Sequence, residues 1–100
     1  MRIELLYVAG CPHCDLTRNR IQAVLNRLNL DTEVIEREIT DVEEAKDLRF
    51  TGSPTLRVDG ADVDPGNEGT AYGLSCRLYD DGQGPSEEAI RSALLAATNG

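Results

Sequence analysis

The sequence predicts an α/β fold in which a four-stranded mixed sheet is flanked by helices, in the element order βαβ-α-ββα. Three observations predict it. An apolar run at residues 2–8 leads into an amphipathic stretch at 12–29, the pattern of a strand followed by a helix. A second apolar run at 32–37 completes a βαβ unit, whose right-handed crossover pairs the two strands in parallel. A last helical pattern covers 87–97, and 100 residues suffice for one modest core, so we expect residues 1–100 to form a single domain.

The first two helices have recognisable apolar faces. On the first helix, the residues expected on the buried side are Leu16, Ile21, Val24, Leu25 and Leu28. Thr40 is the expected N-cap of a short second helix, and Glu43, three positions later, completes the pattern of a capping box. The residues expected to pack inward from this second helix are Val42, Ala45 and Leu48.

The second half of the chain alternates turns and strands before a last helix. A turn at 51–54 precedes a strand at 55–58, and a polar loop at 59–73 separates this strand from another at 74–79. Ser86 is the expected N-cap of the last helix. The residues expected on one face of that helix are Ile90, Ala93, Leu94 and Ala97.

The composition restricts the partners and the location of the protein. A formal net charge of -8 argues against binding to nucleic acid and to anionic membrane surfaces. The sequence contains no apolar stretch long enough to span a membrane, and Met1-Arg2 runs straight into the first strand without a leader pattern. We therefore expect a cytoplasmic protein, and a monomer. Its three cysteines do not indicate a structural disulfide framework in that reducing compartment.

The most informative motif is Cys11-Pro12-His13-Cys14, which joins the first strand to the first helix. Two thiols three residues apart at the first turn of a helix can exchange electrons as a dithiol/disulfide pair. Cys11 is expected near the N-cap, where the helix dipole favours a thiolate. Pro12 is expected at the first helical position, where its missing N–H costs nothing. Cys14 lies one turn further and can reach the sulfur of Cys11, so the motif favours thiol–disulfide exchange.

The motif leaves several roles open. His13 is either an exposed residue of the first turn or a partly protonated imidazole that favours the Cys11 thiolate and makes the disulfide a better oxidant. The dithiol fits a general thiol–disulfide reductase, a redox sensor, or a thiolate site for a soft metal such as mercury, copper or zinc. A zinc site needs further ligands, and Cys76 is the one other cysteine, so we assign no metal ligands. The loop acids match no EF-hand spacing and are expected to be solvated: Asp59, Asp62, Asp64 and Glu68.

Two motifs give the chain a resemblance to the thioredoxin-like superfamily. The first is Cys11-Pro12-His13-Cys14 after the first strand, and the second is Ser53-Pro54-Thr55, which resembles the family's cis-proline loop facing the dithiol. The size is similar to that of glutaredoxins, and the Pro-His dipeptide is similar to that of bacterial disulfide-bond oxidants. The stretches 52–55 and 73–79 also resemble those of a group of small thioredoxin-like proteins. The chain departs from thioredoxins in having no tryptophan, and it has Val8-Ala9-Gly10 where glutaredoxins carry a basic residue.

The resemblance implies a thioredoxin-like fold and a thiol–disulfide oxidoreductase that acts on a protein or small-thiol disulfide client. In this interpretation Cys11 attacks the client, Cys14 resolves the mixed disulfide, and Pro54 in a cis bond shapes the groove. The expected catalytic residues are Cys11, Cys14, His13 and Pro54, and the expected substrate-binding residues are Ser53, Pro12 and Thr55. No cofactor is needed, because the electrons reside on the two sulfurs, but an electron donor must restore the dithiol.

The third cysteine is expected to be structural. In the predicted strand at 74–79, Leu74, Cys76 and Leu78 alternate with Ser75, Arg77 and Tyr79. Cys76 therefore shares a face with two leucines and is expected in the core as a small hydrophobic residue.

Overall fold

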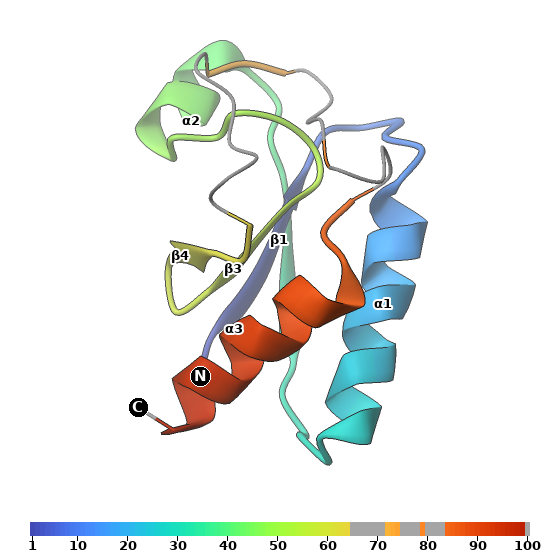
Figure 1. The fold of residues 1–100 in the computed structure, drawn as a ribbon. Helices are drawn as coiled ribbons and strands as arrows, with labels where there is room; N and C mark the ends of the chain where they lie inside the picture. The colour runs from blue at the N-terminus through green and yellow to red at the C-terminus, as the bar shows by residue number, and fades with distance from the viewer. Residues whose placement is uncertain (65–71, 75–78, 80–83, 100) are drawn as a thin grey trace.

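The computed structural model describes residues 1–64, 72–74, 79 and 84–99. These residues form three helices and four strands, and Figure 1 shows how the chain is arranged in space. In chain order the elements are β1 (Ile3–Tyr7), α1 (Cys14–Arg27), β2 (Val34–Glu38), α2 (Val42–Asp47), β3 (Thr55–Val58), β4 (Ala61–Asp62) and α3 (Glu87–Asn99). Within the described part of the chain, no helix combines the length and apolar character needed to cross a membrane.

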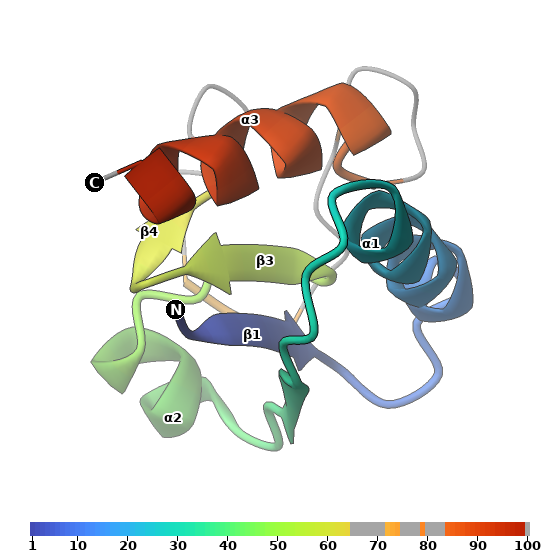
Figure 2. The same ribbon diagram turned by 90° about the horizontal axis from the view of Figure 1, so that it is seen from below.

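The strands form one mixed sheet in the order β2-β1-β3-β4. β1 pairs with β2 in parallel, with Ile3 opposite Val34, and it pairs with β3 antiparallel, with Leu5 opposite Leu56. Figure 2 shows α1 and α3 covering one face of the sheet and α2 lying on the other. This arrangement confirms the predicted α/β fold, in which a four-stranded mixed sheet is flanked by helices.

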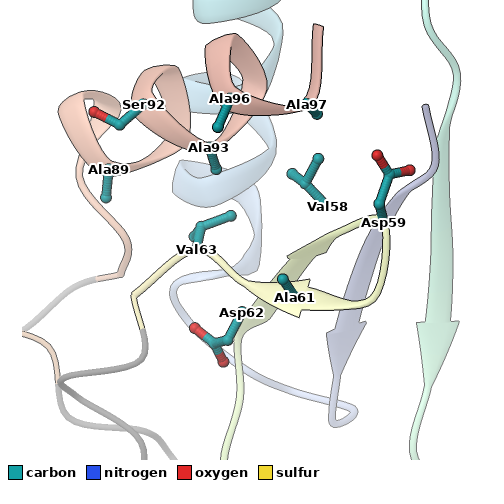
Figure 3. A pocket seen from close by; sticks show the side chains of 10 residues that line it. All are labelled: Val58, Asp59, Ala61, Asp62, Val63, Ala89, Ser92, Ala93, Ala96 and Ala97. Atoms are coloured by element: carbon teal, nitrogen blue, oxygen red, sulfur yellow. The ribbon is translucent and has the colours of Figure 1, made fainter. Parts of the chain in front are cut away.

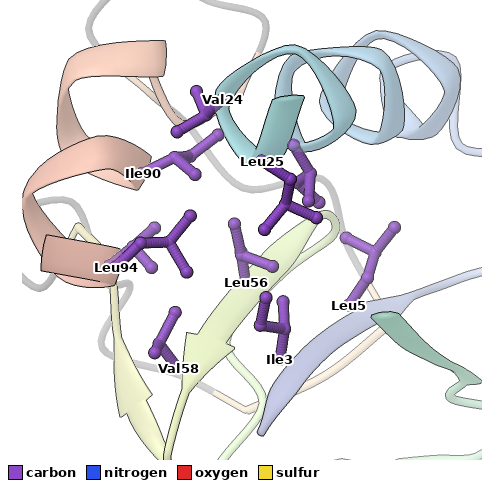
Figure 4. Close-up of a cluster of buried hydrophobic side chains, with 10 residues drawn as sticks. Ile3, Leu5, Val24, Leu25, Leu56, Val58, Ile90 and Leu94 are labelled. Carbon is purple, nitrogen blue, oxygen red and sulfur yellow. The ribbon is translucent and has the colours of Figure 1, made fainter. Parts of the chain in front are cut away.

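The core is divided between the two faces of the sheet because successive residues of a strand point to opposite sides. On the face covered by α1 and α3, Leu5 and Leu56 of the central strands are fully buried and belong to one apolar cluster with Leu94 of α3 (Figure 4). On the opposite face, Leu6 packs with Phe50 under α2. Each fully buried leucine or phenylalanine contributes about 1.5–3 kcal/mol of transfer free energy. The two clusters together bury both faces of β1, the strand that leads into the dithiol motif.

The predicted apolar faces of α1 and α3 are confirmed, except that two of the α1 residues are less buried than expected. Ile21, Val24 and Leu25 of α1 are buried, whereas Leu16 and Leu28 are only half-buried. Ser86 caps α3, because its Oγ accepts a hydrogen bond of 3.1 Å from the Ala89 N–H. The residues of α3 that pack against the core are those predicted from the sequence: Ile90, Ala93, Leu94 and Ala97.

The fourth strand differs from the prediction. On the side away from β1, β3 pairs with β4 (Ala61–Asp62), which lies in the stretch predicted as a loop. Asp59 and Gly60 have φ angles of 52° and 85°, so they form a two-residue turn with positive φ at both positions, for which Asp-Gly is a preferred pair. Of the predicted strand at 74–79, residues 75–78 lie outside the described residues, and Leu74 is exposed rather than in the core. Cys76 falls in that undescribed stretch, so its predicted core position stays a prediction.

The N-terminus of α2 is displaced by one residue from its predicted position. Asp41, not Thr40, is the N-cap, and its Oδ1 accepts a hydrogen bond of 2.7 Å from the Glu44 N–H. Glu44, not Glu43, reaches back, and its Oε1 accepts a hydrogen bond of 2.9 Å from the Thr40 N–H. The shift turns Val42 outward, with an exposure of 47%, so its predicted inward packing is wrong. Asp is as good an N-cap as Thr, and the sequence offers both in succession.

The segment before α3 is held against α1. Arg20 Nη1 donates hydrogen bonds to the carbonyls of Gly84 and Pro85, at 3.4 and 2.9 Å. Gly84 lies so close to α1 that a Cβ atom added to it would be 2.7 Å from Thr17 Oγ1 and 3.8 Å from Pro54 Cγ. Only glycine fits here, and its position joins α1 to the proline loop.

We predict that Gly84→Ala destabilises the protein by about 1–3 kcal/mol, the usual cost of overpacking a filled site. The added methyl group would collide with Thr17, a fully buried β-branched residue with little freedom to move. Gly73→Ala is the matched control, because a Cβ atom at Gly73 meets no atom of the described part of the chain within 4 Å. Urea denaturation measures both variants. An equal free energy of unfolding for the two would contradict the close contact.

Candidate active site

The two cysteines of the motif belong to the junction between β1 and α1. The end of β1 and the start of α1 lie at the upper right of Figure 1. The chain turns after Val8, whose carbonyl accepts a hydrogen bond of 3.2 Å from the Cys11 N–H, and Gly10 has a φ of 77° in this turn. That left-handed conformation is available to glycine without strain. Cys14 is the first residue of α1.

The helix begins two residues later than the sequence predicts. His13 is the N-cap, with a non-helical φ of -105° and ψ of 2°, and its carbonyl accepts a hydrogen bond of 3.1 Å from the Thr17 N–H. Pro12 therefore precedes the N-cap, and its predicted place as first helical residue is wrong. Proline disfavours helical geometry in the residue before it, here Cys11, so Cys11 also stays outside the helix. The free N–H groups and the positive end of the helix dipole are centred on Cys14.

The two thiols are free and differ in burial. Cys11 is half-buried, whereas Cys14 has an exposure of 6%. The pKa of Cys14 is raised to about 11. Burial is the largest cause, and a hydrogen bond with Cys11 and the charge of Cys11 contribute to the same rise. Cys14 is therefore protonated at neutral pH while Cys11 is in its reduced form.

Two neighbours act in the opposite direction on Cys14. Ser53 Oγ lies 3.8 Å from Cys14 Sγ, and this hydrogen bond lowers the pKa of Cys14, as does the positive charge of Arg18. Ser53 is fully buried, and its Oγ also accepts a hydrogen bond of 3.1 Å from the Val8 N–H. The serine thus connects the second cysteine to the end of β1.

The Ser53–Pro54 peptide bond is cis, which confirms the prediction from the resemblance. The loop is fixed by two hydrogen bonds. Thr55 Oγ1 donates to the Gly52 carbonyl at 2.5 Å, and the Tyr79 hydroxyl donates to the Pro54 carbonyl at 2.6 Å. Both side chains are buried, so the loop that faces the dithiol is held from within.

Tyr79 and Arg18 were not identified from the sequence. Tyr79 was expected on the outer face of a strand, but it is buried with its hydroxyl on a loop 25 positions away. Arg18 binds Glu36 of β2 through two hydrogen bonds, of 2.9 and 2.6 Å, and it also pairs with Asp15. With Arg18 and Glu36 more than a third exposed, the pair contributes at most about 1 kcal/mol to stability. Contacts between residues distant in sequence leave no local signal that could have revealed either role.

The remaining predicted site residues take different positions. Pro12 is exposed beside the dithiol, and His13 is half-buried and forms no side-chain hydrogen bond to the helix N-terminus. Thr55 is buried at the start of β3 with its hydroxyl engaged in the loop. The structure therefore brings Cys11, Cys14 and Ser53 together, while Thr55 supports the loop from inside.

No group of three or more potential metal ligands occurs among the residues that the structure describes. Of the loop acids, Asp62 accepts a hydrogen bond of 2.7 Å from the Asp64 N–H, as in an ordinary turn. Asp59 likewise accepts from the Arg2 N–H at 2.7 Å, while Glu68 lies outside the described residues. These acids have backbone partners.

A cavity of about 490 Å³ lies between α3 and the β3–β4 hairpin, as Figure 3 shows. It is lined mainly by small apolar side chains, among them Val58, Val63, Ala89 and Ala93. Val58 is at the end of β3 remote from Pro54, so this cavity is separate from the dithiol.

Comparison with known proteins identifies the family. A search of the curated proteins and of the solved structures found no significant match. A family model described as a thioredoxin domain matches residues 1–70, a range that contains both cysteines of the motif, the cis-proline loop and all four strands. The chain therefore belongs to the thioredoxin-like superfamily.

Proposed function

We propose that the protein is a thiol–disulfide oxidoreductase that exchanges electrons between its Cys11/Cys14 dithiol and a protein or small-thiol disulfide. The observation that carries the proposal is the unequal burial of the two neighbouring thiols, one half-buried and the other 6% exposed. Attack on a client disulfide requires an accessible thiol, and the second thiol only has to reach the sulfur of the first. Membership of the thioredoxin-like superfamily supports a redox role in general.

The proposed reaction has two displacement steps. The Cys11 thiolate attacks one sulfur of the client disulfide, the client S–S bond breaks, and the other client sulfur leaves as a thiolate. Cys14 then loses its proton and attacks the sulfur of Cys11. The Cys11–Cys14 disulfide forms as the first client sulfur leaves, so two electrons have passed to the client. An external dithiol returns them, and the reverse sequence oxidises a client.

The client is proposed to lie along the cis-proline loop. Pro54 is held by Tyr79 from behind, and Ser53 precedes it at the level of the dithiol. An extended client segment can pair with the Ser53 backbone as an added strand would. Pro12 is exposed beside the dithiol and is proposed to contact the client, whereas the buried Thr55 is proposed to support the loop.

His13 is proposed to tune the direction of the reaction. It is the residue between the exposed Pro12 and Cys14, and its side chain is not consumed in capping the helix. A positively charged imidazole here stabilises a thiolate and hence the reduced protein, which makes the disulfide more oxidising. The alternative, a site for a soft metal, receives less support. Beside the two thiols, the side-chain group that contacts Cys14 is the hydroxyl of Ser53, and a soft metal does not favour a hard oxygen ligand.

We predict that the two cysteine variants fail at different steps. Cys11→Ser is expected to abolish the reduction of insulin disulfides. Cys14→Ser is expected to attack but not release, so it accumulates a covalent mixed disulfide at Cys11, detectable by mass spectrometry after reaction with dithiobisnitrobenzoate. Ser92→Ala, on the face of α3 remote from the dithiol, is the control that keeps parental activity. Adduct formation at Cys14 in place of Cys11 would contradict the assignment.

We predict that Cys11→Ala makes Cys14 react faster with iodoacetamide. Two of the causes that raise the pKa of Cys14 to about 11 come from Cys11, so removing Cys11 lowers that pKa. Below this pH the thiolate fraction grows about tenfold for each unit by which the pKa falls. Alkylation rates between neutral pH and about 10 measure the effect, and unfolded samples, in which the two proteins should be equal, are the control. A slower reaction in the folded variant would contradict the coupling.

A further inference from the structure

One lone pair of the Ser53 hydroxyl is occupied by the backbone. The Val8 N–H can only donate, so the 3.1 Å bond to Ser53 Oγ uses a lone pair of that oxygen. The hydroxyl proton is thereby left for another acceptor. Cys14 Sγ, at 3.8 Å, is the side-chain atom that the hydroxyl contacts within the described part of the chain. When Cys14 ionises, its sulfur is an acceptor only, and Ser53 must be the donor.

The surroundings of Cys14 limit the access of water to its sulfur. Ser53 is fully buried and Cys14 is 6% exposed, so the thiolate of Cys14 forms where few hydrogen bonds are available to it. A hydrogen bond from a hydroxyl to a buried anion is worth more than one between neutral groups. The serine hydrogen bond indeed lowers the pKa of Cys14, against the larger effect of burial.

We propose that the Ser53 hydroxyl is the hydrogen-bond donor that stabilises the Cys14 thiolate during its attack on the mixed disulfide. The role rests on the proposed exchange reaction and assigns the resolving step to the Ser53 side chain, in addition to any pairing by its backbone. In this step Cys14 gives its proton to solvent, its sulfur bonds to the sulfur of Cys11, and the client sulfur leaves with the electron pair of the broken bond. Ser53 keeps its own proton throughout and makes the nucleophile available near neutral pH.

The size of the effect follows from two opposing trends. Loss of a hydrogen bond to a charged group raises the pKa of a thiol by about one to two units, while the less stabilised thiolate is more nucleophilic, with a Brønsted coefficient of about 0.4–0.5. The net result for Ser53→Ala at neutral pH is a resolving step roughly three- to fifteen-fold slower. The deficit shrinks as the pH approaches the pKa of Cys14, because both proteins then become ionised. A purely structural role would not produce that pH dependence.

The first experiment follows the resolving step with dithiobisnitrobenzoate. All proteins in this experiment carry Cys76→Ala, which removes the third cysteine of the chain. Cys11 takes one thionitrobenzoate group and releases another, and attack by Cys14 then releases the second. For Ser53→Ala we expect an unchanged first phase and a slower second phase whose deficit falls with rising pH, with rescue by Ser53→Thr. Thr17→Val is the matched control, because it removes a fully buried hydroxyl of α1 that has no hydrogen-bond partner among the described residues. An equal slowing in Thr17→Val, or an unchanged second phase in Ser53→Ala, would overturn the proposal.

The second experiment separates this proposal from the exchange reaction itself. In a Cys11→Ala background, the pH profile of Cys14 alkylation should move upward by about one to two units when Ser53 is also replaced by alanine. Should Ser53→Ala fail to fold, the NMR signal of the Val8 amide in Cys11→Ala should shift with the same midpoint as Cys14, because the hydroxyl connects them. Release of a single thionitrobenzoate by the parent would refute the proposed function while leaving these titrations able to test Ser53. A Val8 signal insensitive to Cys14, or an unmoved alkylation profile, would refute the role of Ser53.

Discussion

The burial of the Cys14 thiol against the Ser53 hydroxyl is the contact through which three distant segments meet. Cys14 begins α1, Ser53 precedes the cis proline, and Val8, which donates to the serine, follows β1. The sheet makes this possible, since β1 pairs antiparallel with β3 and so brings the end of the first strand beside the start of the third. Packing on both faces of β1 then keeps the two ends in register. The contact between Cys14 and Ser53 therefore belongs both to the packing of the fold and to the site of the proposed chemistry.

That contact also explains why two cysteines in one short motif behave differently. Cys14 enters the helix and the interior, where desolvation opposes its ionisation, while Cys11 stays outside the helix and half-buried. In the proposed reaction, a Cys14 thiol that stays protonated does not compete with Cys11 for the client. Once Cys11 is bound in a mixed disulfide, it no longer opposes the ionisation of Cys14. In the proposed reaction, burial and charge therefore favour attack by Cys11 before attack by Cys14.

The extent to which the sequence predicts this protein depends on whether a feature is local. Periodicity identified α1, β1 and β3, because each has an apolar face that must be buried. The Asp59-Gly60 turn was equally local, yet the acids around it favoured a loop, and the two-residue β4 after it was missed. The N-cap of α2 differs from the prediction because Thr40 and Asp41 are both suitable caps, and α1 begins later because Pro12 keeps Cys11 out of the helix. Contacts such as that of Tyr79 with Pro54 have no sequence signal, since they exist only after the sheet has assembled.

The central claim is that Cys11 and Cys14 interconvert between dithiol and disulfide within one chain. The most direct test is to equilibrate the protein in buffers of graded ratios of reduced to oxidised dithiothreitol, trap the thiols with acid and an alkylating agent, and map the linked peptides by mass spectrometry. We expect one reversible two-electron transition that links Cys11 to Cys14, with the same midpoint from either direction. A pair that never closes into this disulfide, or one that closes only between chains, would contradict the account.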